Sequence, residues 1–276
     1  MIAFPCCKIN LGLDIVSKRP DGYHNLETLF YPIPLEDALE ITINPKSDAP
    51  DYTFTMHNAA FEGDDSDNLV VKAYKILAAD HKLPKVIMSL YKNIPTGAGL
   101  GGGSSDAAFA LKMLNEIGKL GLGDEQLEEY AARIGADCAF FIKCRPAYAT
   151  GIGNILTPVE CSLKGYHLVL IKPNLHISTK EAYSLVVPAY PVVPLMDIIQ
   201  RPINMWTSSM KNDFERSAFA KYQQMETIKS ELYRLGALYA SMSGSGSSFY
   251  GIFEKAQDEK ELERLFPDCF RWQCEL

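Results

Sequence analysis

The chain has 276 residues, of which 47% are hydrophobic and 22% charged, and its formal net charge is −7 at pH 7. This length is sufficient for one large or two moderate domains, and the composition is that of an ordinary globular protein. The negative charge argues against nucleic acid as a partner, because binding along a phosphate backbone depends on lysine and arginine.

The sequence also argues against a membrane or secreted location. No apolar run approaches the roughly 20 residues of a membrane span, and the first residues lack the basic and apolar regions of a secretory signal. Seven cysteines are irregularly spaced and form no Cys-x-x-Cys pair, and the five histidines form no paired ligand motif. We therefore expect reduced thiols in the cytoplasm and no structural zinc site.

The first predicted strand, residues 6–16, carries polar side chains among apolar ones. Lys8 and Asn10 are two residues apart, so on a strand they share one face. This pattern is typical of a solvated strand face, and a functional pair is the alternative. Residues 19–22, Arg-Pro-Asp-Gly, are a strong turn signal. Next come predicted strands at residues 26–33, 39–43 and 52–56, and then a helix over 68–79 after an Asp- and Ser-rich cap.

A glycine-rich loop follows the next predicted strand, residues 86–91. Five glycines fall within residues 97–103, and a helical pattern begins after them, with Ala107, Leu111 and Leu114 at helical spacing. Glycines allow close approach of the backbone to a ligand, and a helix N-terminus favours an anion. The strand, loop and helix together predict a phosphate-binding site.

The loop fits neither of the common nucleotide motifs. Gly97-x-Gly99-x-x-Gly102 matches a dinucleotide fingerprint, but no acidic residue ends a second strand about 20 residues later, as a ribose contact requires. A P-loop needs a lysine before its Ser or Thr, and here Gly103 precedes Ser104. An NAD-dependent dehydrogenase therefore remains only as an alternative.

The chain combines long, antiparallel-looking predicted strands with grouped predicted helices, which indicates an α+β fold. After a helix over 125–134, residues 135–141 are expected to turn into an apolar strand, with Asp137 at the transition. Residues 151–154 predict a hairpin turn and the domain boundary, giving domains 1–152 and 153–276. Further predicted elements are a strand at 167–172, a helix start at 178–181, a long helix at 212–235, a small-residue turn at 241–248, a strand at 249–253, and a last helix and strand.

Lys8 and Asp137 together suit phosphoryl transfer, although each alone has a structural explanation as a strand-face or capping residue. A hydroxyl is a weak nucleophile, so a carboxylate that accepts its proton helps the attack. A nearby ammonium would keep that carboxylate ionised and stabilise the developing negative charge.

Residues 95–108 have the form Pro-x-Gly-x-Gly-Leu-Gly-Gly-Gly-Ser-Ser-x-Ala-Ala. This resembles the ATP loop of the GHMP kinases, which include galactokinase, homoserine kinase, mevalonate kinase and phosphomevalonate kinase. Residues 8–11, 19–24, 135–137 and 243–247 resemble further motifs in the same order, over essentially the whole chain. Arg-Pro-Asp-Gly-Tyr-His at 19–24 is similar to one branch alone, which phosphorylates a cytidine diphosphate-linked methylerythritol in non-mevalonate isoprenoid synthesis.

The resemblance implies a two-domain fold and specific site residues. The N-terminal domain would be ribosomal-S5-domain-2-like and the C-terminal domain ferredoxin-like, with an active-site cleft between them. Asp137 corresponds to the general base and Lys8 to its partner, with Asn10 near the accepting hydroxyl. Tyr23 and Tyr183 correspond to the two stacking faces around cytosine, and His24 to the group that hydrogen-bonds its edge.

The resemblance also implies ATP as co-substrate with Mg²⁺. Ser104 or Ser105 could give Mg²⁺ one oxygen, but no dedicated carboxylate ligand is apparent. The second glycine loop, which comprises Ser243, Gly244, Ser245 and Gly246, would pack against the first. The implied ATP contacts are Asn68, Leu69 and Lys92 on the adenine side, and Pro95, Gly97, Ala98, Gly99, Leu100, Gly101, Gly102, Gly103, Ser104 and Ser105 along the loop.

The sequence therefore predicts an ATP-dependent kinase acting on a small molecule. Ala139 replaces a proline that is common after the Asp motif, and Tyr183 stands where some members have Phe. The alternatives are another small-alcohol kinase of homoserine or mevalonate type, the dehydrogenase, and a catalytically silent binding protein. The oligomeric state stays open.

Overall fold

The computed structural model describes residues 1–59 and 64–276, and it divides into two compact units that interleave along the chain. Within these residues, no helix combines the length and apolarity that crossing a bilayer would require. The expected boundary at 152/153 lies beyond the last switch between units, which falls after Arg145. The first unit comprises Met1–Cys7, Leu35–Thr96 and Gly101–Arg145, and the second comprises Lys8–Pro34, Gly97–Leu100 and Pro146–Leu276.

The first unit contains a four-stranded sheet with the order β1-β4-β6-β5. β6 pairs antiparallel with β4 and parallel with β5. Its residues Val86, Met88 and Leu90 are buried while their neighbours are not, which is the alternation expected of a strand with one face on the core. The strands are β1 (Ile2–Ala3), β4 (Ala38–Ile43), β5 (Tyr52–His57) and β6 (Val86–Tyr91).

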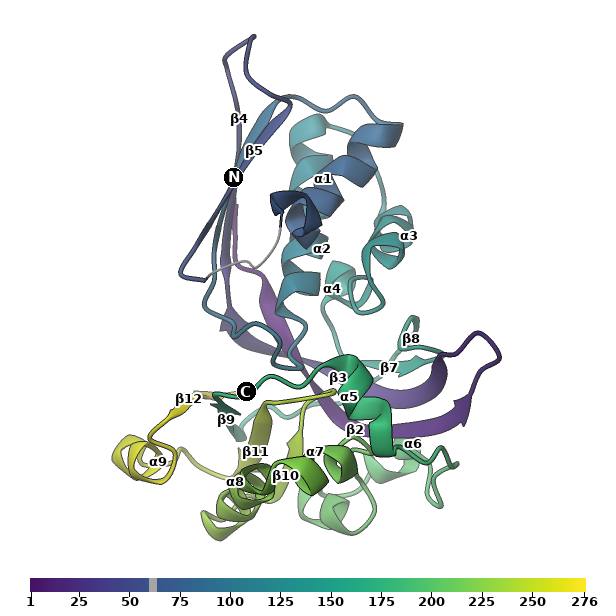
Figure 1. The fold of residues 1–276 in the computed structure, drawn as a ribbon, viewed down its shortest axis with the longest axis vertical. Coiled ribbons are helices and arrows are strands. Elements are labelled where there is room, and N and C mark those ends of the chain that lie inside the picture. Colours follow the sequence, from purple (N-terminus) through teal and green to yellow (C-terminus); the bar gives the residue numbers. More distant parts are fainter. Residues whose placement is uncertain (60–63) are drawn as a thin grey trace. The chain divides into compact units, whose positions relative to one another are not determined.

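Helices of the first unit pack on one another beside this sheet, and α1 and α2 lie together (Figure 1). Their apolar faces follow from helical spacing, because Val70, Tyr74 and Leu77 of α1 are buried, as are Leu111 and Leu114 of α2. The helices are η1 (Asp65–Asp67), α1 (Leu69–Asp80), α2 (Gly102–Gly118), α3 (Asp124–Ile134) and α4 (Phe140–Lys143).

The prediction that residues 135–141 turn into an apolar strand is wrong, because a turn and the short helix α4 occupy this position. Phe140, Phe141 and Ile142 are all buried. A short apolar run that is buried on every side has neither the period of a strand nor that of a helix, so the pattern alone could not distinguish the two.

The second unit contains two four-stranded sheets, ordered β2-β3-β7-β8 and β10-β11-β9-β12. β7 and β8 pair antiparallel around residues 151–154, which confirms the predicted hairpin turn. The strands are β2 (Cys6–Lys18) and β3 (His24–Glu36), which lie mostly in this unit, and β7 (Ala147–Thr150), β8 (Ile155–Pro158), β9 (His167–Pro173), β10 (Tyr239–Met242), β11 (Phe249–Phe253) and β12 (Cys269–Glu275).

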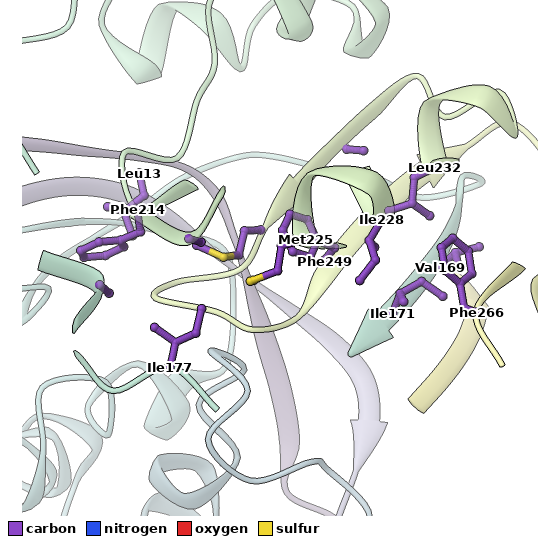
Figure 2. Close-up of a cluster of buried hydrophobic side chains, with 14 of the residues drawn as sticks. Leu13, Val169, Ile171, Ile177, Phe214, Met225, Ile228, Leu232, Phe249 and Phe266 are labelled. Atoms are coloured by element: carbon purple, nitrogen blue, oxygen red, sulfur yellow. The ribbon is translucent and has the colours of Figure 1, made fainter. Parts of the chain in front are cut away.

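The core of the second unit lies between its helices and the β10-β11-β9-β12 sheet (Figure 2). Met225, Ile228 and Leu232 form one face of α8, which packs on β11. Burial of such side chains stabilises the fold by about 1.5–3 kcal/mol each. The helices are α5 (Thr179–Ala182), η2 (Tyr183–Leu185), α6 (Leu195–Ile198), η3 (Ile203–Ser208), α7 (Glu215–Lys221), α8 (Gln223–Arg234) and α9 (Glu259–Leu265).

The long helix expected over residues 212–235 is two helices, α7 and α8. The chain leaves the helical conformation at Tyr222, with φ −130° and ψ 83°. No glycine or proline marks this position, so the sequence carried no breaker signal. The α+β class is confirmed, and all seven cysteines are free.

Candidate active site

The glycine loop leads directly into the N-terminus of α2. Gly97, Gly99 and Gly101 have φ values of 59°, 75° and 70°, a region that L side chains rarely adopt. Gly101 is the N-cap of α2 and has no side chain that could bond the first N–H groups of the helix. These amides and the helix dipole therefore favour an anion at this end of α2.

The glycines of the loop are required for different reasons. A Cβ on Gly99 would lie 2.0 Å from the Ser243 carbonyl oxygen, and one on Gly97 would lie 2.7 Å from His176 Nδ1. A Cβ on Gly103 would instead have only ordinary contact, at 3.6 Å from Leu69 Cδ1. Gly97 and Gly99 thus permit close packing, whereas Gly103 is exposed at the start of the helix.

The second glycine loop packs against the first, as the sequence predicted. The buried Ser243 hydroxyl donates to the Gly99 carbonyl at 2.8 Å. The Ser248 N–H donates to the Ala98 carbonyl at 3.2 Å. The two loops therefore hold each other through direct hydrogen bonds within the second unit.

Lys8 and Asn10 lie on β2 and face the same way, but not toward solvent. They are 3% and 2% exposed, so the solvated strand face is excluded. Lys8 Nζ donates to Asn10 Oδ1 at 2.6 Å and lies 4.7 Å from the centroid of the Phe30 ring. Asn10 Nδ2 donates to Thr28 Oγ1 at 2.9 Å. The lysine ammonium is thus fixed in a buried, hydrogen-bonded position.

Ser243 connects Asn10 to the glycine loop. The Asn10 N–H donates to Ser243 Oγ at 3.3 Å, and the Lys8 N–H donates to the Leu100 carbonyl at 3.0 Å. Asn10 therefore bonds to Lys8 through its side-chain oxygen and to Ser243 through its backbone N–H, and the Ser243 hydroxyl in turn donates to the Gly99 carbonyl.

Asp137 lies in the turn between α3 and α4 and is half-buried in the first unit. Its neighbour Cys138 is buried, which raises the pKa of the Cys138 thiol to about 11, and a hydrogen bond with the Ser104 side chain partly offsets this rise. This contact places the turn that carries Asp137 beside the first turn of α2.

Lys92, expected on the adenine side of ATP, belongs to a buried ion cluster in the first unit. Its ammonium pairs with Asp37 and, at 2.7 Å, with Asp106 Oδ2. The Asn93 and Ile94 N–H groups also donate to Asp37, at 2.6 and 2.8 Å. Burial raises the pKa of Asp106 to about 7, with Lys92 acting in the opposite direction. Asp37 and Asp106 carry no signal of this pairing in the sequence, because they are 55 and 14 residues away from Lys92 along the chain.

The other two residues expected on the adenine side also lie in the first unit. Asn68 caps α1, since its Oδ1 accepts from the Val70 N–H at 2.9 Å. Leu69, the next residue, lies beside Gly103 at the start of α2. The N-termini of the two helices therefore meet at Leu69, and a role in adenine binding stays a prediction.

The residues expected to hold cytosine lie in the second unit. Tyr23 is 62% exposed, and its N–H donates to Asp21 Oδ1 at 3.1 Å, within a turn that the Arg19–Asp21 ion pair closes. His24 stacks on Tyr183 with ring centroids 4.7 Å apart. Burial, with Lys18 nearby, lowers the pKa of His24, which favours the neutral imidazole.

The described residues offer hydroxyl oxygens, not a carboxylate cage, for a metal ion. They bring no three His, Cys, Asp or Glu side chains together as a metal site. Ser105 Oγ is fully buried and has no hydrogen-bond partner, and it lies in the first turn of α2. A Mg²⁺ ion held mainly by phosphates and waters fits such a donor set.

Two family profiles match this chain. The N-terminal domain of GHMP kinases matches residues 68–145, and the C-terminal domain of GHMP kinases matches residues 197–270. Together they cover the glycine loop, the Asp137 turn and the second glycine loop.

Full-length relatives agree with the profiles. A 4-diphosphocytidyl-2-C-methyl-D-erythritol kinase of Bacteroides fragilis is 57% identical over 100% of both chains, and one of Porphyromonas gingivalis is 45% identical over 99% of this chain and 98% of its own. A solved structure of 4-(cytidine 5'-diphospho)-2C-methyl-D-erythritol kinase has a TM-score of 0.83 at 31% identity, covering 99% of this chain and 98% of that one. A homoserine kinase structure from Cytophaga hutchinsonii, at 14% identity and a TM-score of 0.65, shares the fold.

Proposed function

Because the chain belongs to the 4-diphosphocytidyl-2-C-methyl-D-erythritol kinases of the GHMP kinase family, we propose that it phosphorylates the 2-hydroxyl of that cytidylyl alcohol. ATP donates its γ-phosphate, and the products are the 2-phosphate and ADP. The full-length match at 57% identity carries this proposal. The step belongs to non-mevalonate isoprenoid synthesis, and we assign it to the cytoplasm, where free cysteines are stable.

The ATP phosphates bind at the N-terminus of α2. The glycine N-cap, the exposed Gly103 and the helix dipole support this assignment. Mg²⁺ would be held by the phosphates and by a hydroxyl of Ser104 or Ser105, and it would neutralise phosphate charge.

Asp137 acts as the general base and Lys8 as the charge partner. The 2-hydroxyl oxygen attacks the γ-phosphorus, its proton passes to the Asp137 carboxylate, and the bond to the ADP oxygen breaks. The ammonium of Lys8, fixed by Asn10 and Phe30, stabilises the negative charge that develops on the transferring group. Each role follows the family motif at that position.

Tyr23, His24 and Tyr183 bind the cytosine. The exposed ring of Tyr23 offers a stacking face, and the neutral imidazole of His24 offers a hydrogen bond to the base edge. Asn10 orients the methylerythritol end near Lys8.

The alternatives are less well supported. Homoserine and mevalonate kinases are related at 14% and 12% identity, which shows the fold alone. For a dehydrogenase, β6 should sit in an all-parallel sheet, but it pairs antiparallel with β4. A silent binding protein would have no reason to keep a buried Lys8 and an Asp137 at the base position.

Substrate-dependent ADP release tests the proposal. Purified protein with ATP and Mg²⁺ is assayed with 4-diphosphocytidyl-2-C-methyl-D-erythritol, homoserine and mevalonate in parallel. Turnover with the cytidylyl alcohol alone is the expected result. Turnover with another alcohol only would overturn both the substrate and the cytosine assignment.

A further inference from the structure

Residues 212–215, Asn-Asp-Phe-Glu, join two parts of the second unit, and we call them the brace. They follow η3 and end at Glu215, the first residue of α7, and no role followed from the sequence. Each of their three polar side chains bonds to the backbone of another element. One side of the brace contacts the second glycine loop, and the other contacts β2.

Asn212 spans the bend of the second glycine loop. Its Nδ2 donates to the Met242 carbonyl and to the Gly244 carbonyl, both at 2.8 Å, and its Oδ1 accepts from the Phe214 N–H at 2.9 Å. The side chain is 3% exposed, so no water replaces these bonds easily. A single amide group thus holds the carbonyls on either side of Ser243.

Glu215 fixes the strand that enters the loop. Its Oε1 accepts from the Ser241 hydroxyl at 3.1 Å and from the Met242 N–H at 2.9 Å. Lys229 balances the charge at 2.6 Å from Oε2. The carboxylate therefore anchors the end of β10 immediately before Ser243.

Asp213 and the brace backbone hold β2. Asp213 Oδ2 accepts from the Ile15 N–H at 2.8 Å, and the Asp213 N–H donates to the Leu13 carbonyl at 2.9 Å. The strand that carries Lys8 and Asn10 and the loop that carries Ser243 are thus attached to the same four residues.

We propose that Asn212 is a positioning residue for phosphoryl transfer, acting through Ser243. By holding both flanking carbonyls, it sets the bend at which one hydroxyl accepts from the Asn10 N–H and donates to the Gly99 carbonyl. The space there is tight, since a Cβ on Gly244 would lie 3.2 Å from the Gly99 carbonyl oxygen. The inference rests on the proposed kinase function.

The expected consequence is kinetic. Without Asn212 the bend is no longer held, and the Ser243 hydroxyl loses its hydrogen bond to Asn10, to Gly99 or to both. Asn10, which bonds Lys8, and the first glycine loop are then no longer held in a fixed position by the same hydroxyl. A displacement of about 1 Å at a reacting centre can cost about 100-fold in rate. We expect Asn212→Ala to lower kcat by about 10- to 100-fold and to raise KM for ATP.

A double-mutant cycle with Ser243→Ala tests the route. If Asn212 acts through Ser243, the kcat of the double variant should be no lower than that of the slower single variant. The first substitution already abolishes the contribution of the Ser243 hydroxyl, so the second has nothing further to remove. Multiplying effects on kcat would mean that Asn212 acts independently of Ser243, which would overturn the proposal.

Tyr233→Phe is the matched control. The Tyr233 hydroxyl donates to the Ala240 carbonyl at 3.1 Å, on the same strand β10 but away from the bend. This variant should lose some thermal stability and keep kcat and KM. If Asn212→Ala also lowers Tm and leaves both kinetic constants unchanged, the residue is purely structural and the proposal is wrong.

Two measurements separate this inference from the proposed function. Ser243→Ala removes one oxygen only, so it tests the bend even if Asn212→Ala fails to fold. Calorimetry measures the affinity for ATP without any alcohol substrate. Ser243→Ala should lower this affinity, whereas Tyr233→Phe should leave it unchanged. Wild-type protein that binds ATP but fails to phosphorylate the cytidylyl alcohol would reject the substrate and leave this test intact. Unchanged ATP affinity and unchanged kcat in Ser243→Ala would overturn the inference.

Discussion

The imidazole of His24 stacks on the ring of Tyr183, with centroids 4.7 Å apart and 21° between the ring planes. Tyr183 in turn meets Phe214 edge-on at 4.8 Å and 83°. Tyr183 is therefore a support that orients His24, in addition to the stacking face for cytosine that the sequence predicts. One of its faces is already occupied by the imidazole.

We predict that Tyr183→Leu raises KM for the cytidylyl alcohol by about 2- to 13-fold, since an aromatic stacking contact contributes about 0.5–1.5 kcal/mol. The kcat value and KM for ATP should stay unchanged, because stacking binds the ground and transition states alike. Steady-state kinetics measures all three. Tyr190→Ala is the control, as this ring is 76% exposed. A fall in kcat at constant KM would contradict a binding role.

The same contact predicts the titration of His24. Burial lowers its pKa, so the unfolded state binds more protons than the folded state below the ordinary value of about 6.5. The contribution of His24 to the free energy of unfolding is therefore fully present above about pH 6.5 and is lost as the pH falls through the pKa of the folded state.

Proton NMR of the imidazole should show a His24 midpoint below about 6.5. In Tyr183→Leu the midpoint should rise, because the change removes part of the burial. A midpoint that stays constant would show that Tyr183 does not shield the imidazole.

Asp137→Asn should lower kcat by about 100-fold or more, which is the usual contribution of a general base. ATP affinity should be retained, because the variant keeps the shape of the side chain. Asp124→Asn is the control, since Asp124 is exposed in the first turn of α3. Asp137→Asn with undiminished turnover would show that another group accepts the proton.

Local patterns made much of this structure predictable. The apolar run that forms β6 and the glycines before α2 are both signals within a few residues, and both elements were predicted from the sequence. The pairing of Lys92 with Asp37 and Asp106 could not be predicted from the sequence. Three charged residues without a recognisable spacing give no sign that they share a buried site. The contact of Asn212 with Gly244 was missed for the same reason, since only the tertiary fold brings these residues together.

Gly99→Ala should be far more damaging than Gly121→Ala. Both glycines have positive φ, 75° and 69°, so backbone strain of about 1–2 kcal/mol is common to both. Only at Gly99 would the Cβ also meet a carbonyl oxygen, that of Ser243 at 2.0 Å, whereas nothing lies within 4 Å at Gly121. The free energy of unfolding in urea and the affinity for ATP should both fall more in Gly99→Ala than in Gly121→Ala. Equal losses would mean that the two loops separate without cost.

The Lys92 cluster predicts an unusual pH dependence of stability. Lys92 is shared by two carboxylates; backbone N–H groups also donate to Asp37, while Asp106 Oδ1 is buried without a partner. Burial raises the pKa of Asp106 to about 7, against an ordinary value of about 3.9. Between these values the folded state binds more protons than the unfolded state, so this group stabilises the protein below about pH 4, and that contribution is lost as pH rises to about 7.

Asp106→Asn should remove this slope, because the amide does not titrate. The unfolding free energy of the wild type relative to the variant should be highest at and below about pH 4, should decline between about pH 4 and 7, and should reach a plateau above about pH 7. Urea unfolding of both proteins at several pH values measures this difference. If the difference grows with pH instead, attraction to Lys92 outweighs the burial of Asp106, and the pKa of this carboxyl is lowered.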